Sequence, residues 1–203
     1  MVKELDAIER VIWSNFRVKH KDTLPFKGWA GTRDTLAQTM GQLGFKTGAE
    51  IGVCKGEYSE VLLRAISGLK IYCVDPWVAY NRIDQDLADA RYEECIARLS
   101  MYSGVNIIKK PSVEAAAGFP DGSLDFVYID GLHEFDAVML DLLYWAPKVK
   151  VGGIIAGHDY CEFYQAGVIA AVRAYTQAHN IHKWYVTRDR EPSFFWVKAD
   201  DYI

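Results

Sequence analysis

Short apolar segments alternate with segments of helical periodicity from Gly48 onward, and this alternation limits the fold more than any other feature of the chain. The apolar segments predict strands at residues 47–53, 70–74, 105–109, 124–129 and 153–157. Strands that alternate with helices form βαβ units, which build a mostly parallel sheet with helices on both faces. The sequence therefore predicts an α/β fold.

Two further strands are expected near the end of the chain, at residues 183–187 and 193–198, because both segments are rich in β-forming residues. The polar stretch 188–192 between them predicts a hairpin, which brings an antiparallel strand into the sheet. Ahead of the sheet, the apolar periodicity predicts helices at residues 2–18 and 32–43.

The length of 203 residues is typical of one α/β domain, so we expect a single domain over residues 1–203. Residues 1–46 would form a helical segment ahead of a core that spans residues 47–203. The linker 19–29 mixes charged, aromatic, proline and glycine residues. It is either a lid that closes over a substrate or a plain connector between two helices.

The first predicted strand runs into a loop with two glycines, in the sequence Glu50-Ile51-Gly52-Val53-Cys54-Lys55-Gly56-Glu57-Tyr58-Ser59. Gly52 and Gly56 have no Cβ atom, so the backbone there can take unusual angles and a ligand can approach it closely. The next predicted strand ends at Asp75, where a carboxylate can accept hydrogen bonds from both hydroxyl groups of a ribose. The combination indicates an adenosine-type cofactor.

The spacing of the glycines distinguishes between classes of cofactor. Dinucleotide sites use G-x-G-x-x-G, whereas this chain has G-x-x-x-G at Gly52 and Gly56. Glu57 begins the following helix, where its charge would repel a pyrophosphate. A cationic cofactor without phosphate suits the acidic surroundings of Glu50 and Glu57 better. A strand-to-helix turn without any ligand is the structural alternative.

These residues resemble the class I S-adenosylmethionine-dependent methyltransferases, whose Rossmann-like core is a seven-stranded sheet with helices on both faces and a C-terminal antiparallel hairpin. The resemblance extends from about residue 47 to the C-terminus. It implies that the acid and glycines of the loop hold the methionine part of S-adenosyl-L-methionine and that Asp75 holds the ribose. The expected cofactor contacts are Glu50, Gly52, Gly56, Tyr58, Ser59, Asp75, Pro76, Trp77, Ser112 and Asp130.

Two of these assignments have structural alternatives. Ser112 follows the third of the predicted strands, where the resembling family contacts the adenine, but a serine there could equally be the N-cap of a short helix. Trp77 and the nearby Tyr80 could cover the adenine or the substrate with aromatic surface, or could pack on the edge of the sheet.

A second group of polar residues follows two later strands. Asp130 ends the fourth predicted strand, His133 lies three residues further on, and His158-Asp159 ends the fifth. Ligands of open α/β sheets bind beyond the carboxyl ends of the strands, so these side chains should face the same crevice as the glycine loop. Because no Lys or Arg is close to them in the sequence, a divalent cation is the simplest way to offset the repulsion between the carboxylates.

The pattern Asp130-x-x-His133 resembles the metal-dependent O-methyltransferases, most closely the branch that methylates sugar hydroxyls of macrolide antibiotics. The resemblance implies that Asp130 and Asp159 bind a metal, that His133 is the catalytic base and that Asp130 belongs to the catalytic machinery. The chain departs from the family at His158, which replaces an acid and is a further candidate ligand. Mg²⁺, Mn²⁺, Fe²⁺ and Zn²⁺ all remain open, although an imidazole ligand suits Mg²⁺ least.

Composition narrows the class of partner. The chain has 27 Asp and Glu against 23 Lys and Arg, a formal net charge of −4, so we expect a small-molecule substrate and no nucleic acid. No apolar run approaches the roughly 20 residues that cross a bilayer, which predicts a cytoplasmic protein without a membrane partner. Four scattered cysteines are expected to be reduced thiols of the core. The N-terminal helix could mediate a homo-oligomer or simply cover its own sheet.

The leading hypothesis is an S-adenosylmethionine-dependent methyltransferase that uses a metal to methylate a hydroxyl of a small sugar or phenol. Metal coordination would stabilise the forming alkoxide, and His133 would take the proton. The alternatives are metal-independent N- or O-methylation, with Asp130 and His133 binding the substrate directly, and a non-catalytic S-adenosylmethionine-binding module that regulates a partner.

Overall fold

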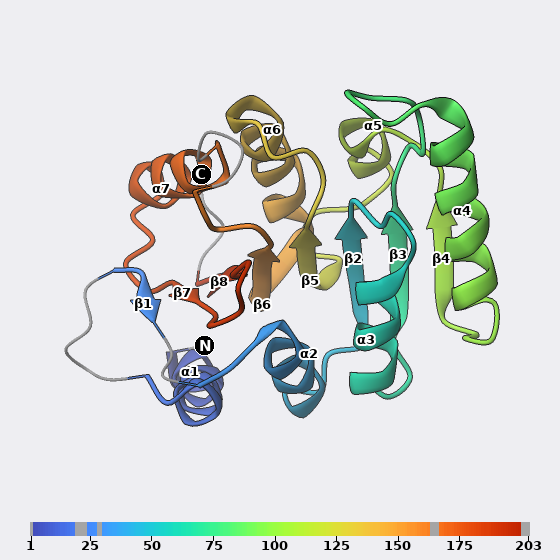
Figure 1. Cartoon of the computed structure of the whole chain (residues 1–203). Coiled ribbons are helices and arrows are strands. Elements are labelled where there is room, and N and C mark those ends of the chain that lie inside the picture. The colour runs from blue at the N-terminus through green and yellow to red at the C-terminus, as the bar shows by residue number, and fades with distance from the viewer. Residues whose placement is uncertain (1, 19–23, 28–29, 163–166, 200–203) are drawn as a thin grey trace.

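The computed structural model describes residues 2–18, 24–27, 30–162 and 167–199. In this part of the chain, eight strands form one sheet in the order β1-β7-β8-β6-β5-β2-β3-β4 (Figure 1). The strands are β1 (Phe26–Lys27), β2 (Thr47–Ile51), β3 (Lys70–Val74), β4 (Val105–Ile108), β5 (Leu124–Ile129), β6 (Val149–Gly157), β7 (Tyr185–Val186) and β8 (Phe194–Val197). The predicted α/β fold is confirmed.

Strand β2 lies at the centre and pairs in parallel with β3 on one side and β5 on the other. Strand β5 pairs in parallel with β6, so the carboxyl ends of β2, β3, β5 and β6 meet at one edge, the upper one in Figure 1. Strand β8 runs antiparallel to both β6 and β7, which confirms the predicted C-terminal hairpin.

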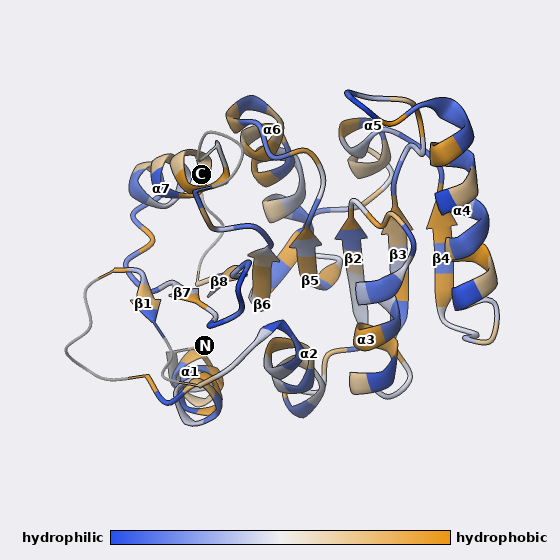
Figure 2. Cartoon of the chain, in the orientation of Figure 1, coloured by the Kyte–Doolittle hydropathy of each residue, from blue (hydrophilic) through white to orange (hydrophobic). Residues whose placement is uncertain are grey.

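Helices cover both faces of the sheet, as predicted. They are α1 (Val2–Phe16), α2 (Arg33–Gln42), α3 (Glu57–Ala65), α4 (Gln85–Leu99), α5 (Ser112–Ala116), α6 (Phe135–Trp145) and α7 (Gly167–Ala178), with a 3₁₀ turn η1 at Ala146–Lys148. Apolar side chains of α1 to α4 bury one face, and those of α5 to α7 bury the other. Figure 2 shows hydrophilic and hydrophobic residues alternating along α3 and α4, as expected for helices with one buried side.

Helix α1 packs on its own sheet through Ile12 and Phe16, both of which are buried. The structural alternative for this helix is therefore realised, and the homo-oligomer stays a prediction. None of the helices in the described ranges is both long enough and apolar enough to span a bilayer.

Strand β1 was not predicted, and it makes the sheet eight-stranded instead of seven-stranded. Phe26 and Lys27 lie within the linker 19–29 and pair in parallel with Tyr185 and Val186 of β7. A two-residue strand has no alternation for the sequence to reveal. Within the linker, residues 26–27 are therefore sheet structure and residues 24–25 form a bend, whereas residues 19–23 and 28–29 lie outside the described residues.

Strand boundaries differ from the prediction where glycine changes the backbone. Strand β2 ends at Ile51 because Gly52 has a φ of +86° and leaves the extended conformation. Strand β6 begins at Val149, four residues earlier than predicted, and its pairing with β5 is irregular around Gly152, whose φ is +80°. Of the cysteines predicted to lie in the core, Cys73 and Cys95 are buried, but Cys54 is exposed on the glycine loop.

Candidate functional site

The glycine loop between β2 and α3 lies directly against the end of β5. A Cβ atom built on Gly52 would be 2.1 Å from the backbone oxygen of Asp130, so only glycine fits at this position. Gly56, with a φ of +75°, is the N-cap of α3 and turns the chain into the helix. The loop and Asp130 therefore occupy one compact region at the carboxyl edge of the sheet.

Asp75, at the end of β3, holds this loop in place. Its Oδ2 accepts hydrogen bonds from the backbone amides of Val53 at 3.0 Å and Cys54 at 2.9 Å. Its Oδ1 accepts from the amide of Trp77 at 2.8 Å. The amides that could have received a phosphate group are thus committed to a carboxylate, which agrees with the expected preference for a cofactor without phosphate.

Glu50 is a buried acid beneath the loop. The hydroxyl of Ser59 donates a hydrogen bond to its carboxylate. Burial raises the pKa of Glu50 to about 8, although the hydrogen bond from Ser59 and the charge of Arg33 oppose this. Tyr58 is also buried, and its hydroxyl donates to the backbone oxygen of Arg33 at 2.9 Å. Tyr58 and Ser59 thus support the loop from inside the protein.

The aromatic residues after Asp75 divide between the two sequence-based interpretations. Trp77 is 3% exposed, donates from Nε1 to the oxygen of Cys54 at 2.8 Å and packs on Tyr92. This is the packing alternative, with the ring braced against the glycine loop. Tyr80 is 45% exposed beyond it, and Pro76 is half-buried between Asp75 and Trp77.

Ser112 is the first residue of α5 and not its N-cap, which is Pro111. Its hydroxyl donates to Asp141 on α6 and accepts a hydrogen bond from Trp145 Nε1 at 2.8 Å. Burial raises the pKa of Asp141 to about 6, against the effect of the bond from Ser112. The sequence analysis missed Asp141, whose spacing of 29 residues from Ser112 gives no signal.

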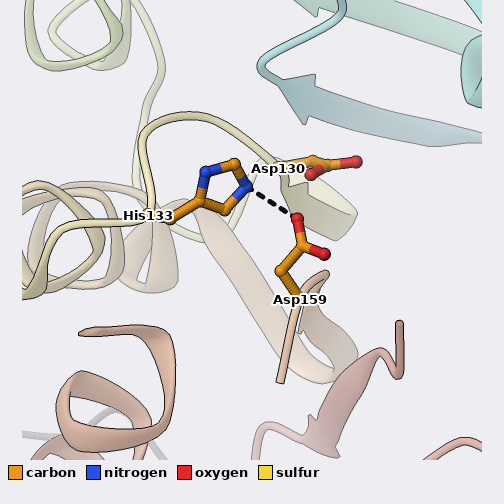
Figure 3. Close-up of side chains that lie close together, drawn as sticks. All are labelled: Asp130, His133 and Asp159. Atoms are coloured by element: carbon orange, nitrogen blue, oxygen red, sulfur yellow. Dashed lines mark ion pairs between the residues drawn. The ribbon is translucent and has the colours of Figure 1, made fainter. Parts of the chain in front are cut away.

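Asp130, His133 and Asp159 converge beside the glycine loop (Figure 3). Each offers one ligand atom, and these atoms all lie within 4.8 Å of one another. Asp130 follows β5, His133 precedes α6, and Asp159 follows β6. His133 Nε2 lies 2.6 Å from Asp159 Oδ2. Asp159 has a φ of +54°, a conformation that few non-glycine residues adopt and that turns its side chain back toward the end of β5.

The two acids of this cluster have opposite electrostatic surroundings. Burial raises the pKa of Asp130 to about 8, and the charges of Asp159 and Glu50 add to the effect. Burial also disfavours the charged form of Asp159, but hydrogen bonds to His133 and His158 outweigh it and hold the pKa of Asp159 well below its ordinary value. One acid is therefore predisposed to hold a proton while its neighbour is predisposed to carry charge.

The cluster differs in one member from the predicted ligands Asp130, Asp159 and His158. His133, expected only as a base, completes it in place of His158. His158 lies behind the acids, with Nδ1 3.4 Å from Asp159 Oδ1 and 3.7 Å from Asp130 Oδ1. Burial lowers the pKa of His158, but its hydrogen bond to Asp159 and the charge of Asp130 outweigh this and raise it. His158 is therefore positioned to orient both carboxylates.

Arg33 is a further member of the site that sequence analysis missed. It is the first residue of α2, and its guanidinium lies over the ring of Tyr58, with Cζ 5.2 Å from the ring centroid. Its charge acts on both Asp130 and Glu50, lowering their pKa values against the larger effect of burial. No Lys or Arg is close to these acids in the sequence, but the fold therefore brings a cation near them.

The cluster nevertheless fits a divalent cation. Two carboxylates and an imidazole are ligands that Mn²⁺, Fe²⁺ and Zn²⁺ accept, and three protein ligands leave positions open for a substrate. The short approach of His133 to Asp159 would have to open, because two ligand atoms of one ion lie farther apart than 2.6 Å. A cation and the proton between these residues are therefore alternatives.

Comparisons with known proteins bear on the whole arrangement. The sequence profile of a methyltransferase-domain family matches residues 49–160, more than half of the chain. No curated protein sequence matches. Among solved structures, a candidate caffeoyl-CoA O-methyltransferase from Staphylococcus aureus has a TM-score of 0.60 at 14% identity and covers 96% of this chain and 92% of its own.

Two other solved structures are similar. An O-methyltransferase from Bacillus cereus, in complex with S-adenosylhomocysteine (SAH), has a TM-score of 0.59 at 15% identity and covers 95% of this chain and 91% of its own. A spermidine synthase from Thermotoga maritima has a TM-score of 0.55 at 15% identity and covers 79% and 55%. At such identities the likeness concerns the fold.

Proposed function

The chain belongs to the methyltransferase-domain family and is a class I S-adenosylmethionine-dependent methyltransferase, and from that premise we propose a reaction. With the help of a divalent cation, the protein methylates a hydroxyl oxygen of a small acceptor, either a sugar or a phenol. The observation that carries the proposal is the convergence of Asp130, His133 and Asp159 beside the glycine loop. A cofactor loop alone needs no such cluster.

The cofactor would bind along the loop from Glu50 to Gly56, with its ribose near Asp75. Three backbone amides already donate to Asp75, so its carboxylate is held in one orientation before any ligand arrives. The carboxylate of Asp75 favours a ligand with a cationic centre. S-adenosylmethionine, when bound, supplies a methyl group on a sulfonium, which an acceptor oxygen can take as the carbon–sulfur bond breaks.

The acceptor would lie against Asp130, His133 and Asp159. Its hydroxyl must lose a proton as the new oxygen–carbon bond forms, and the cluster offers an imidazole and two acids for that task. With Nε2 of His133 paired to Asp159, the ring nitrogen Nδ1 is the atom that can take the proton. Asp159 then has the role of an orienting carboxylate, and His158 supports it from behind.

A divalent cation held by Asp130, His133 and Asp159 would instead lower the pKa of the bound hydroxyl and stabilise the alkoxide. The two roles of His133 exclude each other at Nε2, because one lone pair cannot bind a cation while that nitrogen is protonated and paired to Asp159. In the metal-assisted reaction, His133 would therefore be a ligand, and the hydroxyl proton would leave to solvent water. Metal-independent N- or O-methylation is the alternative in which the pair of His133 and Asp159 acts alone.

A non-catalytic cofactor-binding module is the second alternative. It would need the glycine loop and Asp75, but it would not need the three side chains at the ends of β5 and β6. Their arrangement within 4.8 Å of one another therefore favours an enzyme over such a module.

The test is calorimetric titration of SAH into the full chain, with and without EDTA, followed by titration of Mn²⁺. We expect the wild type to bind both ligands. Asp75→Asn should weaken SAH binding about tenfold, because it removes a charged acceptor, while leaving Mn²⁺ binding unchanged.

Asp130→Asn and Asp159→Asn should have the opposite effect: these variants should no longer bind Mn²⁺ but should still bind SAH. If the wild type does not bind SAH, the cofactor assignment fails. If SAH binds and the wild type does not bind Mn²⁺, the metal-independent alternative replaces the metal-assisted one.

A further inference from the structure

A cavity of about 750 Å³ lies beyond the carboxyl ends of β1 and β7, next to the segment that follows β6. Its volume falls within the range of sites that enclose a small molecule, about 300–1,000 Å³. Lys27 ends β1 and Val186 ends β7, and both line the cavity. The cavity therefore opens at the same edge of the sheet as the glycine loop.

The cavity adjoins the cluster of Asp130, His133 and Asp159 along the chain. Tyr160 and Cys161, which line it, directly follow Asp159. The amide of Tyr160 donates to the oxygen of Pro192 at 2.8 Å, so the wall from β6 is fixed to the loop between β7 and β8. A molecule in the cavity could thus reach toward Asp159 while its other end stays among the residues of the hairpin.

The walls combine apolar surface with an excess of positive charge. Tyr160 and Val186 are buried and form apolar wall. Four cationic side chains line the cavity against one acid, which leaves an excess of three positive charges (four minus one): Lys27, Arg173, Arg188 and Arg190, against Glu162. This excess stands out in a chain with a formal net charge of −4.

Three of these four cations are not explained by ion pairs with neighbouring acids. Within the described residues, no acidic side chain forms an ion pair with Lys27, Arg173 or Arg190, although Glu162 lines the same cavity. Arg173 is held by a hydrogen bond from Nε to the hydroxyl of Tyr160, 3.1 Å long. Like charges gathered around one cavity repel one another, and an anion bound among them relieves that repulsion.

We propose that this cavity binds the methyl acceptor and that the acceptor carries an anionic group, a carboxylate or a phosphate. The inference rests on the proposed function and adds the substrate class to it. Guanidinium groups match the geometry of both anions and bind them with charge-assisted hydrogen bonds. The apolar wall takes the ring or chain of the acceptor, and its hydroxyl extends toward Asp159.

The test compares acceptor-like probes that differ in charge. Calorimetry on the SAH-loaded full chain, at low ionic strength, would measure the binding of 3,4-dihydroxybenzoate, of catechol and of inorganic pyrophosphate. Catechol has the same hydroxyl groups as dihydroxybenzoate but no carboxylate. We expect dihydroxybenzoate or pyrophosphate, or both, to bind at least about tenfold more tightly than catechol, with an advantage that shrinks as salt is added. The anion that binds more tightly shows whether a carboxylate or a phosphate is the preferred group.

Arg173→Gln and Arg190→Gln should each weaken the binding of the preferred anion about tenfold. Arg10→Gln is the matched control, because Arg10 is an exposed arginine of α1 that does not line the cavity. The inference is overturned if catechol binds as tightly as both anions, or if the control loses as much affinity as the two variants.

SAH binding by the same protein separates this inference from the proposed function. If SAH binds normally and the anions do not, the acceptor inference fails and the methyltransferase assignment stands. If SAH does not bind, the proposed function fails, and with it the assignment of the cavity to a methyl acceptor, whatever the anions do.

Discussion

At the scale of single residues, Glu50 makes the stability of the protein depend on pH. Its pKa is raised to about 8 by burial, from about 4.3 in an unfolded chain. A raised pKa in the folded state stabilises the fold below the unfolded value, and that stability is lost as the pH rises through the folded value. We expect the free energy of unfolding to fall between about pH 4.5 and pH 8, because the charged carboxylate becomes costly to bury.

Glu50→Gln should remove much of the pH-dependent fall in the free energy of unfolding, because a neutral amide replaces the acid that must ionise. At pH 8.5 the variant is expected to gain about 3 kcal/mol relative to the wild type, and at pH 5 much less. Urea unfolding across this pH range measures the difference. Glu57→Gln is the control, because Glu57 begins the helix that follows the glycine loop and its side chain is 67% exposed. Equal pH profiles for Glu50→Gln and the wild type would contradict the argument.

The close approach of Gly52 to Asp130 is a second feature of single residues. In Gly52→Ala, the new Cβ would lie 2.1 Å from a backbone oxygen that cannot move aside easily, and the positive φ adds strain. Gly44→Ala is a matched control, because Gly44 has a φ of +76° but open space around its Cβ position. We expect Gly44→Ala to cost about 1 kcal/mol and Gly52→Ala at least about 2 kcal/mol more.

Only the Gly52 variant should also lose affinity for SAH, because the amides of the displaced loop no longer hold the Asp75 carboxylate in its orientation. Urea unfolding and calorimetry on both variants measure the two effects. Similar losses of stability in both variants would mean that the loop moves away from β5 at little cost.

At the scale of elements, one hydroxyl joins α5 to α6. Ser112 donates to Asp141 and accepts from Trp145, so Ser112→Ala would leave a buried acid and a buried indole without this partner. We expect a loss of about 1–3 kcal/mol in the free energy of unfolding. The loss should be larger at pH 8 than at pH 5, because the pKa of Asp141 is about 6 and only the charged form depends strongly on the donor.

Ser123→Ala is the control for this effect, since the hydroxyl of Ser123 is exposed and bonds only a nearby backbone oxygen. SAH calorimetry on Ser112→Ala also tests the predicted contact with adenine. Unchanged affinity together with lower stability would assign Ser112 to the joint between the helices, whereas weaker binding would support the cofactor contact.

The elements themselves were largely predictable, because each is encoded in a continuous segment. Strands β3 and β5 have the predicted bounds, since an apolar run of this length between turn residues has no competing interpretation. Strand β1 escaped prediction because its partner β7 lies more than 150 residues away and its two residues carry no pattern. Pairing across such distances is decided by the assembled sheet.

At the scale of the whole molecule, the site is assembled from separate parts of the chain. Sequence reasoning could place Asp75, Asp130 and Asp159 at one edge, because parallel strands end together. It could not identify Arg33 as their neighbour, because α2 reaches that edge through contacts made only after folding. The amide of Arg33 donates to Asp189 in the loop between β7 and β8 at 2.9 Å. Distances within the cluster likewise decide whether His133 or His158 completes it, and no spacing in the sequence determines them.

Ligands of the site should stabilise the molecule as a whole. Binding to the folded state at a hundredfold excess over the dissociation constant adds about 2.7 kcal/mol. For a chain of this size, SAH should then raise the midpoint of thermal unfolding by about 5–10 °C. Mn²⁺ should add a separate increase, because its ligands Asp130, His133 and Asp159 are not those of the cofactor loop.

Asp159→Asn separates the two contributions. This variant removes the acid that is paired to His133 and leaves the glycine loop and Asp75 intact. We therefore expect SAH still to raise the midpoint of thermal unfolding, and Mn²⁺ no longer to raise it. Differential scanning fluorimetry with each ligand, with both and with EDTA measures the four states. An equal increase with Mn²⁺ in the variant and the wild type would show that the cation binds elsewhere. The pair of His133 and Asp159 would then serve as the base without a metal.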